Sequence, residues 1–144
     1  MEHLKGKQLV KKDKTEAEAD EVLADAEIVG FYFSAHWCGP CQAFTPILAK
    51  AYKEMKDAGY KFEVIFVTSD NDENAMFEYM NECHGDWYAL PYDSEPIREL
   101  KKKYSIRGIP TLVVIKKDDD TIIREDGCDD VESYGADAYK HWIK

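Results

Sequence analysis

The sequence predicts an α/β sandwich built on one mixed β-sheet. Two short runs, Ile28–Phe33 and Phe62–Val67, are almost continuously apolar, as is typical of strands covered on both faces. Segments with apolar residues at helical spacing follow both runs, and two further apolar segments flank Asp118–Asp120 as in a hairpin. Strands and helices therefore alternate before a hairpin closes the sheet. With 144 residues, the chain is long enough to bury one core, and we expect a single domain over residues 1–144.

Two segments precede the first apolar run. Gln8–Lys11 is short and partly apolar, and we expect a strand at the edge of the sheet. Thr15–Ala26 is rich in Ala and Glu and carries its apolar residues at helical spacing, which predicts a helix.

The longest predicted helix follows the first apolar run. It begins near Cys38, carries an apolar stripe from Phe44 to Met55, and ends at Gly59. Pro46 lies inside this pattern, and we expect a kink there because proline has no backbone N–H to donate.

The second half of the chain contributes the remaining elements. We expect helices over Asn71–Cys83, Pro96–Tyr104 and Val131–Ile143, the last of them irregular near Gly135. The apolar segments are Trp87–Leu90, Thr111–Ile115 and Thr121–Arg124, and the last two form the predicted hairpin.

The acidic composition argues against nucleic acid as a partner. There are 29 acidic and 19 basic residues, for a net charge of −10, whereas a nucleic-acid surface must be basic. No segment approaches the roughly 18 apolar residues that span a bilayer, and the Lys-rich N-terminus lacks the apolar stretch of a signal peptide. The four cysteines are too unevenly spaced for a secreted disulfide framework. We therefore expect a cytoplasmic location that can extend to the nucleus, and neither nucleic acid nor membrane as a partner.

The strongest functional signal is the pentapeptide Trp37-Cys38-Gly39-Pro40-Cys41. Two thiols three positions apart at the start of a helix can form and break a disulfide. The helix N-terminus presents unpaired N–H groups and the positive end of its dipole to Cys38, which favours the reactive thiolate. Pro40 suits the first turn of a helix, and Gly39 allows another backbone to approach the sulfur closely. Cys41 is then placed to resolve a mixed disulfide formed by Cys38.

A structural zinc half-site is the alternative for these two cysteines. Tetrahedral zinc needs two more ligands, usually a second close pair, and the nearest candidate is Cys83-His84. We favour redox chemistry, with no metal. Cys83 lies on an apolar helix stripe and is expected to be a buried structural thiol. Cys128 follows Gly127 in a polar segment and is expected to be incidental, exposed and prone to oxidation or to intermolecular pairing.

A second signal lies at Arg107-Gly108-Ile109-Pro110-Thr111, at the entrance to a buried strand. A proline there marks a strand start or a special turn, because it cannot donate to the ladder. Together with the cysteine pentapeptide, this motif resembles the thioredoxin superfamily. The resemblance implies a three-layer sandwich, with helices on both sides of a central mixed sheet, and a cis peptide bond before Pro110. It also implies a groove in which the backbone at Ile109 pairs with an extended substrate segment.

Other segments resemble the tryparedoxin and nucleoredoxin branch of that superfamily. They are Phe31–Cys38, Phe44–Pro46, Val64–Asp70 and the insertion Trp87–Pro91. Tryparedoxins usually carry Pro-Pro between the cysteines, where this chain has Gly39-Pro40. Thioredoxins have a buried Asp six positions before the first cysteine, where this chain has Tyr32. The group that deprotonates Cys41 is therefore open, with water or a carboxylate from Asp70–Glu73 as candidates.

The resemblance implies a thiol–disulfide oxidoreductase that reduces protein disulfides by cycling Cys38 and Cys41 between dithiol and disulfide. The implied substrate contacts are Trp37, Gly39, Pro40, Ile109 and Pro110. An upstream thiol reductant, similar to thioredoxin reductase or glutathione, must regenerate the dithiol, and no cofactor is needed. One alternative is a redox-sensitive binding module for a signalling partner, with little turnover. An oxidase or isomerase of the secretory pathway is the other, and the lack of targeting signals argues against it.

The histidines and the second tryptophan are weaker candidates. We expect His36 to be a solvated neighbour of Cys38, and His3, His84 and His141 show no partner pattern. Trp87 is expected to lie in the core rather than beside a partner groove.

Overall fold

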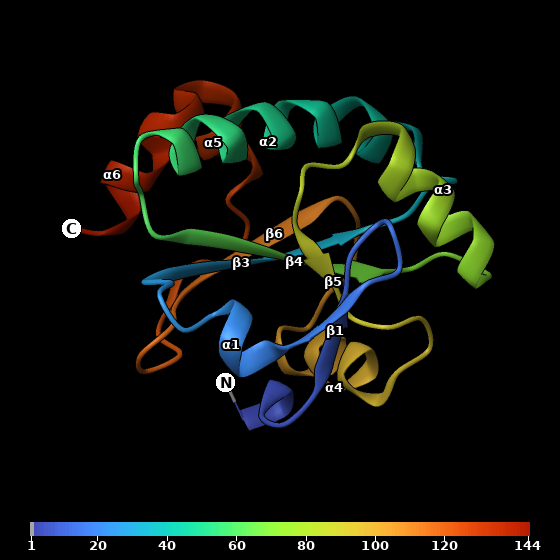
Figure 1. The fold of residues 1–144 in the computed structure, drawn as a ribbon. Helices are drawn as coiled ribbons and strands as arrows, with labels where there is room; N and C mark the ends of the chain where they lie inside the picture. Colours follow the sequence, from blue (N-terminus) through green and yellow to red (C-terminus); the bar gives the residue numbers. More distant parts are fainter. Residues whose placement is uncertain (1) are drawn as a thin grey trace.

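A seven-stranded sheet runs through the middle of the structure, a computed structural model that describes residues 2–144 (Figure 1). The strands are β1 (Gln8–Val10), β2 (Glu16–Glu18), β3 (Ile28–Ser34), β4 (Phe62–Thr68), β5 (Tyr88–Ala89), β6 (Thr111–Lys116) and β7 (Ile122–Arg124). Their order is β2-β1-β5-β4-β3-β6-β7. The pairs β3–β4 and β4–β5 are parallel and the other four are antiparallel, which confirms the expected mixed sheet.

Helices cover both faces of this sheet. They are η1 (Glu2–Leu4), α1 (Ala19–Val22), α2 (Gly39–Asp57), α3 (Glu73–Cys83), α4 (Glu95–Lys103), α5 (Cys128–Tyr134), η2 (Gly135–Asp137) and α6 (Ala138–Trp142). In Figure 1, α2, α3, α5 and α6 lie on one face, and α1 and α4 lie on the other, so the three-layer sandwich is confirmed. None of these helices has the length and apolar character needed to cross a bilayer.

Strand β3 lies between β4 and β6 and separates two hydrophobic cores. Tyr32 belongs to the core under α2, whereas Phe31 and Phe33 belong to the core under α4. All seven residues of β3 are buried, as expected for a strand covered on both faces.

The register of the central strands brings distant segments to one edge. Ser34, at the end of β3, pairs with Thr68 at the end of β4, and Phe33 pairs with Thr111 at the start of β6. The loops beyond these three positions therefore meet at the same end of the sheet. Cys38 follows β3, the loop after Thr68 follows β4, and Pro110 directly precedes β6.

The N-terminal segments differ from the prediction. Only Ala19–Val22 of the expected helix is helical, because Glu16–Glu18 pairs with Gln8–Val10 as strand β2. Pairing with a neighbouring strand overrides the helical propensity of Ala and Glu here. Strand β1 is flanked by β2 on one side and β5 on the other, so its placement at the sheet edge was wrong.

The other helices follow the prediction closely. Helix α2 continues through Pro46. The C-terminal helix is divided into α5 and α6 by a 3-10 turn that starts at Gly135, where φ is +56°. The expected irregularity near Gly135 is thus confirmed.

Candidate functional site

Cys38 and Cys41 form a disulfide at the N-terminus of α2. Cys38 is the N-cap residue, and the backbone N–H of Cys41 donates a hydrogen bond of 3.3 Å to its sulfur. Cys41 is fully buried and Cys38 is 7% exposed, while Gly39 and Pro40 between them are exposed. The sulfur of Cys38 therefore lies nearer the surface, beside the unpaired N–H groups of the helix start.

The turn before β6 faces this disulfide. The Ile109–Pro110 peptide bond is cis, as the resemblance implies. The carbonyl oxygen of Ile109 lies 3.9 Å from the sulfur of Cys38, and both Ile109 and Pro110 are half-buried. The hydroxyl of Thr111 donates to the carbonyl of Gly108 at 2.7 Å and closes the turn. Two segments far apart in the sequence are thus brought together at the disulfide.

Trp37 is the most exposed large apolar side chain of the site, at 61%. Its indole N–H donates to the carbonyl of Ser69 at 3.0 Å, which fixes the ring against the loop after β4. Buried Asp70 holds the same region, because it accepts the N–H of His36 at 2.7 Å and the hydroxyl of Thr68 at 2.8 Å. The loop after β4 therefore positions the residues just before Cys38.

His36 is less solvated than the sequence suggested. Its ring is half-buried, stacks on Tyr79 at 5.6 Å, and pairs through Nε2 with Glu82 at 2.6 Å. Its carbonyl accepts the side-chain amide of Gln42. Helix α3 supplies both Tyr79 and Glu82, a contact that sequence spacing alone does not reveal.

Four buried hydroxyls form a cluster behind the disulfide. Thr45 donates to the carbonyl of Cys41 at 2.7 Å, and its oxygen lies 2.7 Å from the hydroxyl of Tyr32 and 2.5 Å from that of Tyr79. Ser34 contacts Tyr79 at 2.5 Å. Burial raises the pKa of both Tyr32 and Tyr79, so their hydroxyls stay protonated.

The sequence reasoning missed this hydroxyl cluster. Two signals in the sequence point towards it. Thr45 is four residues after Cys41 on the same helix, and Tyr32 stands where thioredoxins have an acid.

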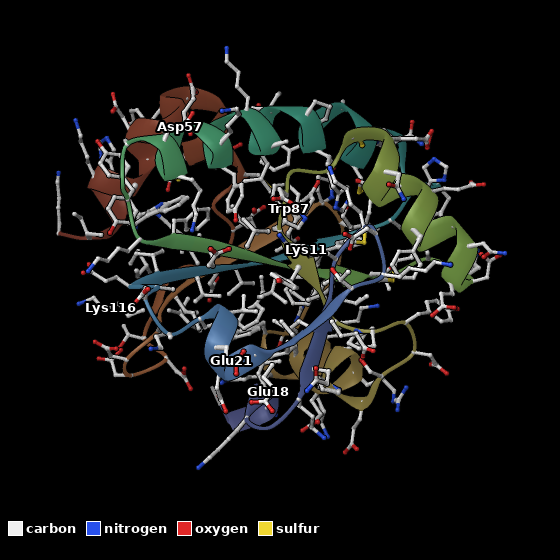
Figure 2. The ribbon with its side chains drawn as sticks, viewed as in Figure 1. Lys11, Glu18, Glu21, Asp57, Trp87 and Lys116 are labelled. Carbon is white, nitrogen blue, oxygen red and sulfur yellow. A yellow bond between two sulfur atoms is a disulfide. The ribbon has the colours of Figure 1, made fainter. Side chains whose placement is uncertain are left out.

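His84 has a partner that its sequence context did not indicate. Its Nδ1 accepts the indole N–H of Trp87 at 3.0 Å, and burial lowers the pKa of the imidazole to about 3. Trp87 is 1% exposed and packs edge-on against Tyr52 of α2, inside the core (Figure 2). The core assignment of Trp87 is confirmed, and the structure gives partners that the sequence pattern did not show to His84, in Trp87, and to His3, in Glu99 at 2.8 Å.

The two remaining cysteines are free thiols. Cys83 is half-buried rather than buried as expected, and its burial raises the pKa of the thiol. Cys128 is buried rather than exposed, because α5 begins at this residue and packs against α2. Burial, with a further effect of Asp126, raises the pKa of its thiol. The expectation that Cys128 is exposed was therefore wrong. Among residues 2–144, no three His, Cys, Asp or Glu side chains are grouped to hold a metal, so the zinc alternative finds no further ligands.

Sequence comparison relates the chain to redox proteins. A thioredoxin-like family model matches residues 25–121. A probable nucleoredoxin 1 from Arabidopsis thaliana is 40% identical over 132 residues, which cover 91% of this chain and 22% of the relative. Nucleoredoxin from Bos taurus is 45% identical over 98 residues, covering 67% of this chain and 22% of the relative. The chain thus spans 22% of the length of each of these two relatives.

Solved structures give the same relationship over nearly the whole chain. Thioredoxin related protein 16 from Carcinoscorpius rotundicauda, described with a role in regulating transcription factor NF-kB activity, is 51% identical, with a TM-score of 0.85 and full coverage of both chains. Tryparedoxin I from Crithidia fasciculata is 31% identical, with a TM-score of 0.82, covering 94% of this chain and 91% of the other. The tryparedoxin and nucleoredoxin resemblance is thereby confirmed, and it supports thiol–disulfide chemistry at Cys38 and Cys41.

Proposed function

Because this chain belongs to the thioredoxin-like family, we propose that it is a thiol–disulfide oxidoreductase that reduces protein disulfides. One observation carries the proposal. The Cys38–Cys41 disulfide caps the N-terminus of α2 with the carbonyl of Ile109 only 3.9 Å from the outer sulfur. A reversible disulfide beside an accessible backbone is what exchange with another protein requires.

The cycle starts from the reduced dithiol. The thiolate of Cys38, favoured by the N–H of Cys41 and by the helix dipole, attacks one sulfur of a substrate disulfide. A mixed disulfide forms, and the other substrate sulfur leaves as a thiolate that takes a proton. Cys41 then loses its proton and attacks the sulfur of Cys38. The Cys38–Cys41 disulfide closes, and the second substrate sulfur leaves as a thiol, so that two electrons have passed to the substrate.

The substrate docks on the exposed rim of the site. Trp37 offers a flat aromatic surface, and the exposed Gly39 and Pro40 leave the approach to Cys38 open. The backbone at Ile109, next to Pro110, would pair with an extended segment of the substrate. A thiol reductant, similar to thioredoxin reductase or to glutathione, would regenerate the dithiol in a reducing compartment, the cytoplasm or the nucleus.

Two cysteine variants test this cycle. In an insulin-reduction assay, Cys38→Ser should abolish turnover because it removes the attacking sulfur. Cys41→Ser should lose turnover and accumulate mixed disulfides, which non-reducing gels and mass spectrometry of the attached peptide would detect. Cys83→Ser is the matched control and should keep full activity, since that thiol is half-buried at the end of α3. Full activity of both Cys38→Ser and Cys41→Ser would refute the cycle.

A redox-sensitive binding module is the second candidate function. It is favoured by the 51% identity to the relative that is described with a role in regulating transcription factor NF-kB activity. In that case a partner isolated through Cys41→Ser would bind the wild-type dithiol and disulfide forms with different affinities. Calorimetry on the two forms would measure the difference, and insulin reduction would then be negligible.

A further inference from the structure

The protons of the hydroxyl cluster can be assigned by counting. A carbonyl oxygen only accepts, so the single proton of Thr45 goes to the carbonyl of Cys41. The contacts of Tyr32 and Tyr79 with the oxygen of Thr45 must then use the protons of the two tyrosines. Because the hydroxyl proton of Tyr79 is already donated to Thr45, the hydroxyl of Ser34 donates to the oxygen of Tyr79. Each of the four hydroxyls therefore donates in one fixed direction, and the bonds converge on the carbonyl of Cys41.

Thr45 is the point where this cluster joins the disulfide turn. Its oxygen donates one hydrogen bond and accepts two, which uses the full capacity of a hydroxyl. The two tyrosines come from β3 and α3, so the hydroxyl of Thr45 is held by the sheet on one side and by a neighbouring helix on the other. Hydrogen bonds that donate in series in a buried site strengthen one another.

The backbone of Cys41 is held at two points. Its carbonyl accepts from Thr45 at 2.7 Å, while its N–H donates to the sulfur of Cys38 at 3.3 Å. The neighbouring N–H of Gln42 donates to the carbonyl of Cys38 at 3.0 Å and completes the first turn of α2. The carbonyl of Cys41 and the N–H of Gln42 belong to the same peptide unit, so a shift of that carbonyl would disturb the first turn of α2, which presents the N–H of Cys41 to Cys38.

We propose that Thr45 is a positioning residue for the redox pair. Its hydroxyl, ordered by Tyr32 and Tyr79, aligns the backbone N–H of Cys41 with the sulfur of Cys38 and so stabilises the Cys38 thiolate. This inference rests on the redox role proposed above for the cysteine pair. It concerns the intrinsic properties of the dithiol, which are measured without any protein substrate, so its failure is distinguishable from failure of the proposed function.

The test compares Thr45→Val with Thr45→Ser. Thr45→Val has nearly the same shape but lacks the donor, and it should raise the pKa of the Cys38 thiol by about half to one unit. The ultraviolet absorbance of the thiolate reports that pKa. At a pH above the pKa, the equilibrium with glutathione should move about threefold to tenfold towards the disulfide, since the reduced form loses stabilisation. Thr45→Ser retains the hydroxyl and should restore both values.

Tyr32→Phe separates positioning from mere stability. It removes one hydroxyl but leaves Thr45 with the proton of Tyr79 and the bond to Cys41. Tyr32→Phe should lower the midpoint of urea unfolding, while the pKa of Cys38 and the glutathione equilibrium should change much less than in Thr45→Val, because the donor to the carbonyl of Cys41 is retained.

A further variant keeps the inference testable if Thr45→Val does not fold. The fourfold variant replaces Tyr32 and Tyr79 by Phe, Ser34 by Ala and Thr45 by Val. It removes the whole cluster, so no hydroxyl of the cluster remains buried without a partner. It should show the same rise in the pKa of Cys38. An unchanged pKa and glutathione equilibrium in the folded Thr45→Val or fourfold variant would overturn the inference.

Discussion

The buried imidazole of His84 should make folding sensitive to mild acid. Its ring lies edge-on to Phe66 at 4.4 Å and to Tyr79 at 4.3 Å, and its Nδ1 accepts the indole N–H of Trp87. Protonation would place a second donor against that N–H and a positive charge in an apolar site. The folded protein therefore holds the imidazole neutral, with its pKa lowered by burial to about 3.

The expected loss of stability follows from the difference between the two states. In the unfolded chain the imidazole has a pKa of 6.5, so it binds a proton as the pH falls from 7 to 5, while the folded protein does not. The unfolded state thus binds more protons, and stability must fall as the pH falls. Over this interval the loss amounts to about 2 kcal/mol, and further acidification towards pH 3 would add to it.

Urea unfolding of the oxidised protein at pH 7 and at pH 5, followed by tryptophan fluorescence, measures this loss. The comparison is with His84→Gln, whose amide oxygen can still accept from Trp87 but which does not titrate. His84→Gln should be less stable than wild type at pH 7 and should lack the additional loss of about 2 kcal/mol at pH 5. The other three histidines are shared by both proteins and cancel in the difference. The same pH dependence in both proteins would refute the assignment of a neutral buried imidazole.

Three further outcomes are expected. Gly30→Ala should lower the free energy of unfolding by about 1–3 kcal/mol, because the added Cβ would lie 2.9 Å from Leu112 Cδ1; Gly108→Ala, with no atom within 4 Å, should cost little in the same urea titration. Cys128 should resist alkylation in the native oxidised protein and react after unfolding, as peptide mass spectrometry would show, and rapid native labelling would contradict its burial. Trp37→Ala should reduce kcat/KM for insulin about tenfold and leave the midpoint of urea unfolding unchanged, since the ring is mainly exposed. A lower unfolding midpoint would instead indicate a structural role of the ring.

The sequence was sufficient for the parts of the fold that repeat a simple pattern. Strands β3 and β4 are continuous apolar runs, and α2 carries one apolar stripe, so burial and periodicity agree there. The disulfide was predicted from the spacing of Cys38 and Cys41 at a helix start, whereas the cis bond before Pro110 was implied by the family resemblance. The helix prediction was wrong at Glu16–Glu18. These residues favour a helix, but they pair with β1 and form backbone hydrogen bonds with it as strand β2.

Side-chain environments were harder to predict, because they depend on packing between distant elements. The polar sequence around Cys128 suggested a surface loop, yet the thiol is buried at the start of α5. Likewise nothing near His84 in the sequence shows that four aromatic rings surround it, those of Tyr32, Phe66, Tyr79 and Trp87. Such environments depend on which elements pack together in the fold, and the local sequence composition does not show this.

Tyr32, which stands where thioredoxins have a buried Asp, shows how the sequence motif and the structure complement each other. The motif comparison shows that a buried acid is missing, and the structure shows that a hydroxyl bonded to Thr45 takes its place. Because burial raises the pKa of Tyr32 and Tyr79, the cluster holds no charge near neutral pH and cannot accept the proton of Cys41. An acid in this position would repel a nearby thiolate, whereas neutral hydroxyls add no such repulsion and leave the helix dipole unopposed at Cys38. The region behind the disulfide therefore acts by fixing the geometry of Cys41 rather than by titrating with it.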